Sequence, residues 1–462
     1  MNTETICALA TAPGGALGII RISGPQSLEI LSRIFTKNLS DARPNTIHYG
    51  HIVEYPIESD SMSQHPIDEV LVSVFRAPHS YTGEDSAEIS CHGSRYILNK
   101  VLDLLIQHGC RMANPGEYTQ RAFLNGKMDL SQAEAVADLI ASSNKATHHI
   151  ALSQLRGIFS SELTKLREKL LKLTSLLELE LDFSDHEDLE FADRSELLSI
   201  AEDINARITS LAHSFETGQA IKQGIPVAIV GKTNVGKSTL LNRLLHEDRA
   251  IVSDIHGTTR DTIEDTIDIN GVTFRFIDTA GIRQTSDTIE QIGIERTYVA
   301  ISKARIILWL IDTPPSQAEA LDMIERSKGH TLLPIINKAD ILPYSSVDKY
   351  ATVLQQPSPL LISAKTGQGI DALETAIFNA ADLPTISDSN IIITSARQYD
   401  ALLRASQDLN RVLSGLHSGL SADIISEDLR LVLDDLADIT GQGRIVTNEV
   451  LENIFQHFCV GK

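Results

Sequence analysis

The sequence of 462 residues has few cysteines and no long hydrophobic run. Its four cysteines, Cys7, Cys91, Cys110 and Cys459, show neither the spacing of a metal site nor the pattern of a disulfide framework. This argues against a cysteine-stapled secreted scaffold and favours a reducing compartment. Because the chain shows no basic-plus-apolar signal peptide and no run approaching about eighteen apolar residues, we expect a cytoplasmic protein without a membrane partner.

Basic residues are also scarce. The 40 lysines and arginines are outnumbered by 61 aspartates and glutamates, so the formal net charge is −21. This charge argues against a broad cationic surface, and any nucleic-acid contact must be local or made through a partner. The histidines His92, His148 and His149 have no ligand partner at metal spacing, so we interpret them as ordinary polar or capping residues.

The most informative motif present is a phosphate-binding loop. Residues 231–238 read Gly-Lys-Thr-Asn-Val-Gly-Lys-Ser, between a strand-like apolar run and a helix-like run. Backbone N–H groups at the start of such a helix can surround a β-phosphate. Lys237 would reach the β/γ oxygens as a catalytic group, and the hydroxyl of Ser238 would bind Mg²⁺. The predicted nucleotide contacts of this loop are Asn234, Val235, Gly236, Lys237, Ser238 and Thr239.

Guanine-nucleotide motifs follow in order, each after a strand-like apolar run. They are Asp278-Thr279-Ala280-Gly281, Asn337-Lys338-Ala339-Asp340 and Ser363-Ala364-Lys365. Asp278 would act on Mg²⁺ through water, and the N–H of Gly281 would reach the γ-phosphate. The carboxylate of Asp340 can accept hydrogen bonds from guanine N1–H and N2–H₂, a donor pair that adenine does not offer. The sequence therefore predicts an α/β domain that binds and hydrolyses GTP.

Helical patterns flank this domain. Glycine and proline are nearly absent from about Leu130 to Ala220, and helical spacing returns from Thr394 to Phe458. In the second stretch the spaced apolar residues are Ile424, Leu429, Leu431, Leu433 and Leu436. We interpret both stretches as one helical domain interrupted by an insertion, the alternative being two separate helical tails.

The first 120 residues differ from the rest. They combine short apolar segments, Gly and Pro breaks and a helix-like stretch near 97–108, which is an α+β pattern. The predicted boundaries are 1–122 for this domain, 123–223 and 385–462 for the two halves of the helical domain, and 224–384 for the inserted domain.

Longer motifs occur along nearly the whole chain. In the N-terminal part they are Ala12-Pro13-Gly14-Gly15, Gly18-Ile19-Ile20-Arg21-Ile22-Ser23-Gly24-Pro25 and Tyr81-Thr82-Gly83-Glu84-Asp85. Further along they are Pro115-Gly116-Glu117-Tyr118, Arg121-Ala122-Phe123-Leu124-Asn125-Gly126-Lys127-Met128-Asp129-Leu130, Gln132-Ala133-Glu134-Ala135 and Phe458-Cys459-Val460-Gly461-Lys462. With these motifs the chain resembles the MnmE (TrmE) family of tRNA-modification GTPases. The combination is more specific than a phosphate-binding loop alone.

The resemblance implies a multidomain protein: an α+β N-terminal folate-binding domain that also dimerises, an all-α helical domain and an inserted α/β P-loop GTPase domain. It implies a homodimer and a flavoprotein partner, MnmG, which carries FAD. Together they would add an aminomethyl or carboxymethylaminomethyl group to C5 of the wobble uridine of certain tRNAs, bound mainly through the partner. The carbon unit would come from a reduced folate, a tetrahydrofolate derivative.

Motif correspondence assigns the folate contacts to Arg21, Glu88, Lys127 and Lys462. The three cationic side chains could pair with folate carboxylates, while Glu88 could accept from pterin N–H groups. Cys459 has two interpretations. Its thiol could be the nucleophile in uridine modification, or it could be a small apolar residue that packs the C-terminal tail.

The resemblance further implies potassium-activated hydrolysis. Ile282 stands where Ras-like GTPases place the water-orienting glutamine, so the family pattern assigns that role to Glu290. Neither Arg260 nor Arg283 is fixed by spacing as an arginine finger, and a K⁺ ion held by Asn234 would take its place.

The first switch would supply the other ligands of both cations. Its predicted nucleotide-contacting residues are Ser253, Asp254, Ile255, His256, Gly257, Thr258 and Thr259. Thr259 would bind Mg²⁺, and Ser253, Ile255 and Thr258 would complete the K⁺ shell. Dimerisation of two GTP domains is the event expected to order this loop.

A second function class is a ribosome-assembly or signalling GTPase of the same potassium-activated group, acting as a binding switch. The folate-type motifs and the C-terminal Cys459-Val460-Gly461-Lys462 favour the first class. Assembly factors usually carry a basic RNA-binding appendage, and this acidic chain has none.

Overall fold

A computed structural model describes residues 4–54, 66–182, 194–248, 265–277, 299–342, 350, 360–384, 390–441, 448–456, 458 and 460–461. The chain divides into two compact units. Unit 1 comprises Met1–Ile140, Gln154–Asn205 and Ala401–Lys462, and unit 2 comprises Ala141–Ser153 and Ala206–Asp400. Among the described residues, none of the helices combines the length and apolarity needed to cross a membrane.

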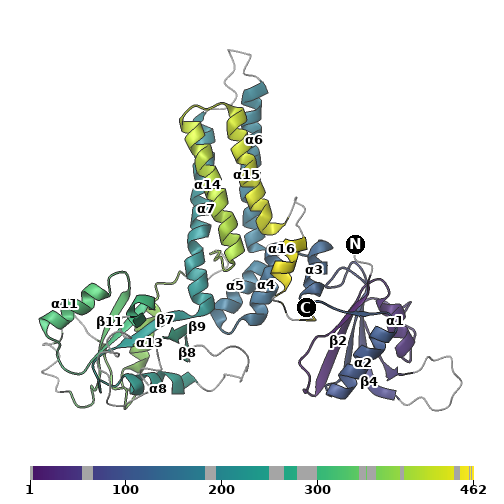
Figure 1. The fold of residues 1–462 in the computed structure, drawn as a ribbon, viewed down its shortest axis with the longest axis horizontal. Helices are drawn as coiled ribbons and strands as arrows, with labels where there is room; N and C mark the ends of the chain where they lie inside the picture. Colours follow the sequence, from purple (N-terminus) through teal and green to yellow (C-terminus); the bar gives the residue numbers. More distant parts are fainter. Residues whose placement is uncertain are drawn as a thin grey trace. The chain divides into compact units, whose positions relative to one another are not determined.

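Unit 1 begins with a mixed sheet in the order β3-β4-β5-β2-β1-β6. Its strands are β1 (Ile6–Leu9), β2 (Leu17–Ser23), β3 (Thr46–Val53), β4 (Pro66–Phe75), β5 (Ser86–His92) and β6 (Arg111–Met112). Helices α1 (Ser27–Ile34) and α2 (Arg95–Gln107) cover one face (Figure 1). Alternate strand residues such as Ile20, Ile22, Val72 and Ile89 pack in the core beneath them, as period-2 patterning requires.

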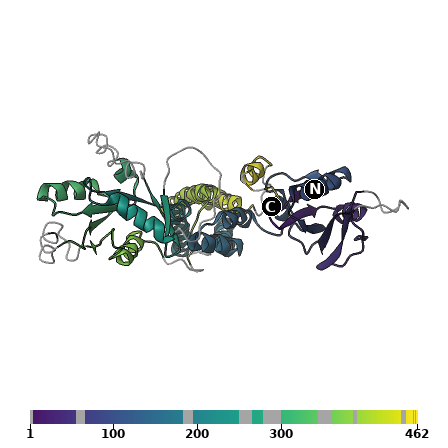
Figure 2. The same ribbon diagram turned by 90° about the horizontal axis from the view of Figure 1, so that it is seen from below.

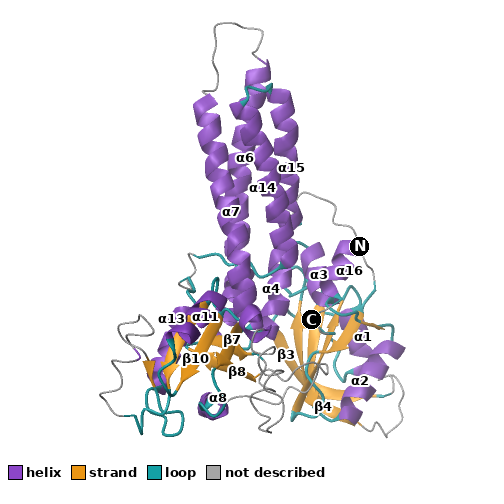
Figure 3. Ribbon diagram, turned by 60° about the vertical axis from the view of Figure 1, so that its left-hand side comes forward, coloured by secondary structure: helices purple, strands orange, loops and turns teal. Residues whose placement is uncertain are grey.

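Helices follow the sheet of unit 1 along the chain, and others near the C-terminus complete this part. They are α3 (Glu117–Leu124), α4 (Leu130–Ala141), α5 (Lys145–Leu155), α6 (Ile158–Asp182), α7 (Arg194–Gln223), α14 (Ala396–His417), α15 (Ala422–Thr440) and α16 (Asn448–Phe455), of which α7 and α14 are shared with unit 2 and α5 lies mostly in unit 2. Figures 1 and 3 show α6, α7, α14 and α15 side by side, and Figure 2 looks nearly along them. Ion pairs such as Arg404–Asp435, at 2.9 Å, join α14 to α15.

Unit 2 contains a sheet in the order β12-β11-β10-β7-β9-β8, parallel except for the edge strand β8. Its elements are β7 (Ile225–Val230), α8 (Lys237–Asp248), β8 (Asp265–Ile269), β9 (Val272–Phe276), β10 (Ile306–Ile311), α11 (Gln317–Arg326), β11 (Thr331–Ile336), β12 (Leu360–Leu361) and α13 (Ile370–Ala380). Every residue of β10 is buried, because apolar side chains cover both faces of this central strand.

The predicted fold class is confirmed: an α+β part, an all-helical part, and an α/β part that the chain inserts between α7 and α14. The strands expected before the phosphate-binding loop and before the Asn337 motif are β7 and β11, and the helix expected near 97–108 is α2. The helix expected around Leu429 is α15, although not all of its apolar residues are buried. Its buried stripe includes Leu429, Val432 and Leu436, whereas Ile424 and Leu431 are 51% and 43% exposed because they lie outside that stripe.

A buried ion network holds the start of α3. Glu117 Oε1 lies 2.7 Å from Arg111 Nη2 and 2.9 Å from Arg121 Nη2, and the side chains of Glu117 and Arg121 are each 4% exposed. The N–H of Asn114 also donates to Glu117, at 2.8 Å. Burial opposes the charged carboxylate, but hydrogen bonds from these three residues outweigh it, so the pKa of Glu117 lies below its usual value.

We expect Arg121→Met to reduce the local stability of this part by about 3 kcal/mol, because it leaves a buried carboxylate short of a partner. Folding lowers the pKa of Glu117, so its ionised form stabilises the folded state. This stabilisation is fully present above the unfolded pKa of about 4.3 and is lost as the pH falls through the folded-state pKa. Hydrogen exchange of amides 111–124 at neutral and acidic pH measures both effects. Arg33→Met, which breaks an exposed pair with Glu29, is the control, and unchanged protection in Arg121→Met would contradict the account.

Candidate functional site

The phosphate-binding loop joins the end of β7 to the start of α8. Gly231 and Gly236 adopt φ values of 154° and 102°. A Cβ added at Gly236 would lie 2.3 Å from Asn337 Nδ2, and one at Gly231 would lie 2.5 Å from the Leu310 oxygen. Both positions therefore require glycine, which keeps the loop backbone close to its neighbours and open to an anion at the helix start.

Lys237 is the first residue of α8. Its ammonium donates to the carbonyl oxygens of Gly231, at 2.5 Å, and Lys232, at 2.9 Å. Burial lowers the pKa of Lys237. The cation is thus held against the loop that surrounds the predicted phosphate position, which fits a bound nucleotide phosphate. Ser238 follows it, partly buried in the first turn of α8.

Asn234 lies at the tip of the same loop, exposed and with φ at 61°. Asparagine tolerates this left-handed conformation better than most side chains. Because the residue is exposed, its amide is accessible to a cation from solvent.

The Asn337 motif follows β11 and contacts the phosphate-binding loop directly. Asn337 is 2% exposed; its Nδ2 donates to the oxygen of Val235 at 2.8 Å, and its Oδ1 accepts from the N–H of Ala364 at 3.0 Å. The N–H of Ala339 donates to Ile362, which anchors the turn. Asp340 is exposed at the end of this turn, so its carboxylate is open to a ligand.

The loop at 363–365 is held from two sides. Ser363 is fully buried, and its Oγ accepts from the N–H of Thr366 at 3.2 Å. From α8, Arg243 donates to the oxygens of Ala364, at 3.4 Å, and Lys365, at 2.7 Å. The phosphate-binding loop, the Asn337 motif and this loop therefore meet at the carboxyl ends of parallel strands, where ligands bind in open α/β sheets.

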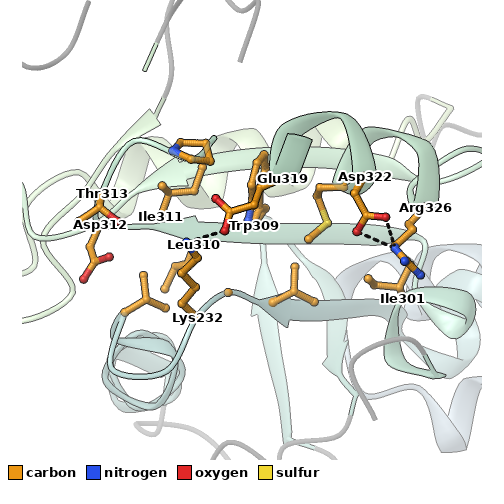
Figure 4. A pocket seen from close by; sticks show the side chains of 15 residues that line it. Lys232, Ile301, Trp309, Leu310, Ile311, Asp312, Thr313, Glu319, Asp322 and Arg326 are labelled. Carbon is orange, nitrogen blue, oxygen red and sulfur yellow. Dashed lines mark hydrogen bonds and ion pairs between the residues drawn. The ribbon is translucent and has the colours of Figure 1, made fainter. Parts of the chain in front are cut away.

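A cavity of about 270 Å³ lies between β10 and α11 (Figure 4). Apolar side chains including Ile301, Trp309 and Met323 line it, and a 2.7 Å ion pair joins Lys232 to Glu319 there. Gly231, Lys232 and Val235 of the phosphate-binding loop also line this cavity, but Lys237 and Asp340 do not, so it adjoins the predicted nucleotide site without coinciding with it.

A second group of predicted residues meets in unit 1. Arg21 and Glu88 face each other on β2 and β5, and Glu88 Oε1 accepts from Arg21 Nε at 2.9 Å and from Nη2 at 2.7 Å. Arg21 Nη1 donates to the oxygen of Gly461 at 3.1 Å. The rings of Tyr81 and Tyr118 lie 5.8 and 5.6 Å from the guanidinium carbon. Strands distant in sequence and the C-terminal segment thus form one aromatic and charged site.

Lys127 lies beside the loop that carries Tyr81. Its ammonium donates to the oxygen of Pro78 at 2.9 Å, and a Cβ at Gly83 would contact its stem at 3.4 Å. No hydrogen bond joins the described side chains of Lys127 and Arg21. The other predicted residues lie outside the described ones: Ser253, Asp254, Ile255, His256, Gly257, Thr258, Thr259, Arg260, Asp278, Thr279, Ala280, Gly281, Ile282, Arg283, Glu290, Cys459 and Lys462.

Some residues of these sites were missed from the sequence. No local signal pointed to the site contacts of Arg243 or of Tyr118, which was noted only as part of a family motif, because these contacts join segments distant in the chain. Asp312 carried one: it is the first polar residue after the apolar run of β10, at the carboxyl end of a parallel strand. Within the described residues, no group of three or more His, Cys, Asp or Glu side chains is placed to hold a metal ion.

The chain matches two family profiles. The profile described as the MnmE helical domain covers residues 130–459, and that of the GTP-binding protein TrmE N-terminus covers residues 5–127. The chain is 54% identical to the tRNA modification GTPase MnmE of Phocaeicola vulgatus, in an alignment that covers 100% of this chain and 99% of that protein. Identity to the MnmE of Bacteroides thetaiotaomicron is 55%, covering 100% of both chains. Identity to the MnmE of Porphyromonas gingivalis is 48%, over 100% of this chain and 98% of that protein.

Asp340→Asn should exchange the preferred base. An amide in place of the carboxylate can donate to the C2 oxygen of xanthine but meets the N2 amino group of guanine donor to donor. We expect affinity for GDP to fall about hundredfold and affinity for xanthosine diphosphate to rise, measured by calorimetric titration. Asp371→Asn, at an exposed site in the first turn of α13, is the control. An unchanged GDP affinity would show that Asp340 does not contact the base.

Proposed function

This chain belongs to the MnmE family of tRNA modification GTPases, and we propose that its GTP hydrolysis serves the addition of an aminomethyl or carboxymethylaminomethyl group to C5 of the wobble uridine of certain tRNAs. A flavoprotein similar to MnmG, carrying FAD, is the proposed partner and provides most of the tRNA contact, in the cytoplasm. The net charge of −21 supports this division, because an acidic chain is poorly suited to bind tRNA by itself.

The convergence of Arg21, Glu88 and Gly461 carries the proposal. These residues come from β2, β5 and the C-terminal segment, yet the guanidinium of Arg21 donates hydrogen bonds to both Glu88 and Gly461. The Arg21 and Glu88 side chains are 22% and 30% exposed, so each is reachable by a ligand. A tetrahydrofolate derivative bound here supplies the one-carbon unit.

The chain's own groups would bind and orient that derivative. Glu88 accepts from pterin N–H groups, and the exposed ring of Tyr81 offers a stacking surface. Arg21, Lys127 and Lys462 pair with its carboxylates. Lys462 directly follows Gly461, which supports its place in this set. Cys459 is retained as a candidate nucleophile for the uridine, with tail packing as the alternative.

At the nucleotide site, Lys237 neutralises the β/γ-phosphate oxygens, and Asn337, Asp340 and the loop at 363–365 select guanine. Mg²⁺ is held by Ser238 and Thr259, with Asp278 acting through water. Glu290 orients the attacking water. The partly buried hydroxyl of Ser238, one residue after Lys237, supports the Mg²⁺ assignment.

We assign the remaining charge stabilisation to K⁺. Its ligands are Asn234, Ser253, Ile255 and Thr258, and association of two GTP domains orders the first switch around it. The exposure of Asn234 at the tip of the phosphate-binding loop supports this assignment, because its amide is accessible to a cation.

The open face of the N-terminal sheet supports a homodimer. Ile47 and Tyr49 of β3 and Leu71 of β4 are 67%, 54% and 47% exposed, and Tyr49 pairs with Leu71 across the strands. Adjacent exposed apolar side chains on a sheet face are typical of an interface. A second copy of the chain is the proposed occupant.

Arg21→Gln should weaken tetrahydrofolate binding about tenfold or more, because it removes a charge-assisted partner of the folate carboxylate and releases Glu88. Calorimetric titration of the purified chain measures it. Arg33→Gln, in the same domain but in an exposed pair with Glu29 on α1, should bind as the wild type does. Absence of folate binding by the wild type at micromolar concentrations would reject the folate part of the proposal.

GTP hydrolysis should be at least about tenfold faster in KCl than in NaCl at equal ionic strength. Asn234→Gly should abolish this difference, since glycine accepts φ at 61° without strain but has no amide oxygen. Asn234→Asp keeps an oxygen ligand and should retain part of the rate difference between KCl and NaCl. Equal initial rates in both salts for the wild type would exclude the potassium site and favour Arg260 or Arg283 as an arginine finger.

A further inference from the structure

Asp312 occupies the carboxyl end of the central strand of unit 2. It directly follows Ile311 of β10, whose oxygen accepts from the N–H of Asn337 at 2.8 Å. Figure 4 shows its carboxylate beside Thr313, at the end of the strand that carries Leu310 and Ile311. The first residue of the Asn337 motif therefore lies beside the backbone that leads into Asp312.

The carboxylate of Asp312 holds Lys338. Lys338 Nζ lies 2.7 Å from Asp312 Oδ2, and the two side chains are 37% and 24% exposed. Lys338 has φ at 64°, a left-handed conformation that is unfavourable for a non-glycine residue. A strained backbone position persists only when its surroundings fix it, and this ion pair is the side-chain contact that fixes Lys338.

Asp312 is itself anchored. Tyr350 is 1% exposed, and its hydroxyl donates to the backbone oxygen of Asp312 at 3.0 Å. Burial raises the pKa of Tyr350, and the charge of Asp312 adds to this, so the phenol remains a donor at neutral pH. A buried ring thus fixes the backbone from which the carboxylate reaches Lys338.

We propose that Asp312 is a positioning residue for guanine recognition: by pairing with Lys338 it holds the left-handed turn that presents Asn337 and Asp340 to the base. The inference rests on the proposed guanine-binding role of residues 337–340. Without Asp312 the nucleotide itself must order this turn, and the binding free energy is reduced by that cost. The phosphate-binding loop is unaffected, so hydrolysis of bound GTP keeps its rate.

The test compares Asp312→Ala and Asp312→Asn with the wild type. We expect the Kd for GDP and the KM for GTP to rise about five- to tenfold in Asp312→Ala, with kcat within about twofold. Asp312→Asn keeps an oxygen acceptor of nearly the same shape and should show a smaller rise. Asp322→Ala, which removes another paired carboxylate of unit 2, from α11, is the matched control and should leave the Kd unchanged.

A double-mutant cycle with Lys338→Gly separates positioning from general stability. Glycine adopts φ at 64° without strain and has no ammonium to pair, so Asp312→Ala in that background should change the Kd by less than about twofold. The same loss in both backgrounds, or a fall in kcat at unchanged Kd, would overturn the inference. Failure of the wild type to bind GDP would instead reject the assignment of residues 337–340. Unfolding curves of each variant show whether a change in affinity comes from unfolded protein.

Discussion

The nucleotide site depends on one buried amide. Asn337 donates to Val235 in the phosphate-binding loop and accepts from Ala364 in the loop after β12, and it is almost fully excluded from solvent. A buried amide that loses either partner leaves a polar group unsatisfied, at a cost of about 1–3 kcal/mol each. The phosphate-binding and base-binding loops are therefore fixed together through Asn337.

The parallel sheet makes this arrangement possible. Neighbouring β7, β10 and β11 all end at one edge, so the segments that follow them emerge side by side although they are far apart in sequence. Gly236 must lack a Cβ because the amide of Asn337 occupies that space. Arg243 fixes the loop at 363–365 from α8, and Asp312 fixes Lys338 of the Asn337 motif from the end of β10. Catalytic motifs that look independent in the sequence are thus parts of one hydrogen-bonded assembly.

The site around Arg21 is assembled in a different way. There the antiparallel register sets Arg21 opposite Glu88, and the C-terminal segment completes the set through Gly461. The buried Glu117–Arg121 pair holds the start of α3, the helix that carries Tyr118 close to Arg21. A charged network with little exposure thus fixes the position of an aromatic wall of the proposed folate site.

Local patterns predicted much of this architecture. The apolar runs before each nucleotide motif are strands, and Lys237 begins a helix, because phosphate-binding loops impose both. Contacts between distant segments could not be read from the sequence. Asp312, Arg243 and Tyr118 act through partners at least 26 residues away, as Lys338 is from Asp312. In α15, periodicity predicted the helix but not which apolar residues are buried: Ile424 and Leu431 are exposed, since a helix rich in apolar residues fits more than one stripe.

The most direct test of the central claim is hydrogen exchange in the phosphate-binding loop and at residues 363–365, measured for the wild type, Asn337→Ala and Asn337→Asp. If Asn337 fixes both loops together, Asn337→Ala should speed exchange in both. Asn337→Asp keeps the acceptor for Ala364 but loses the donor to Val235, so it should loosen mainly the phosphate-binding loop. Faster exchange confined to residues 363–365 in Asn337→Ala would contradict the account.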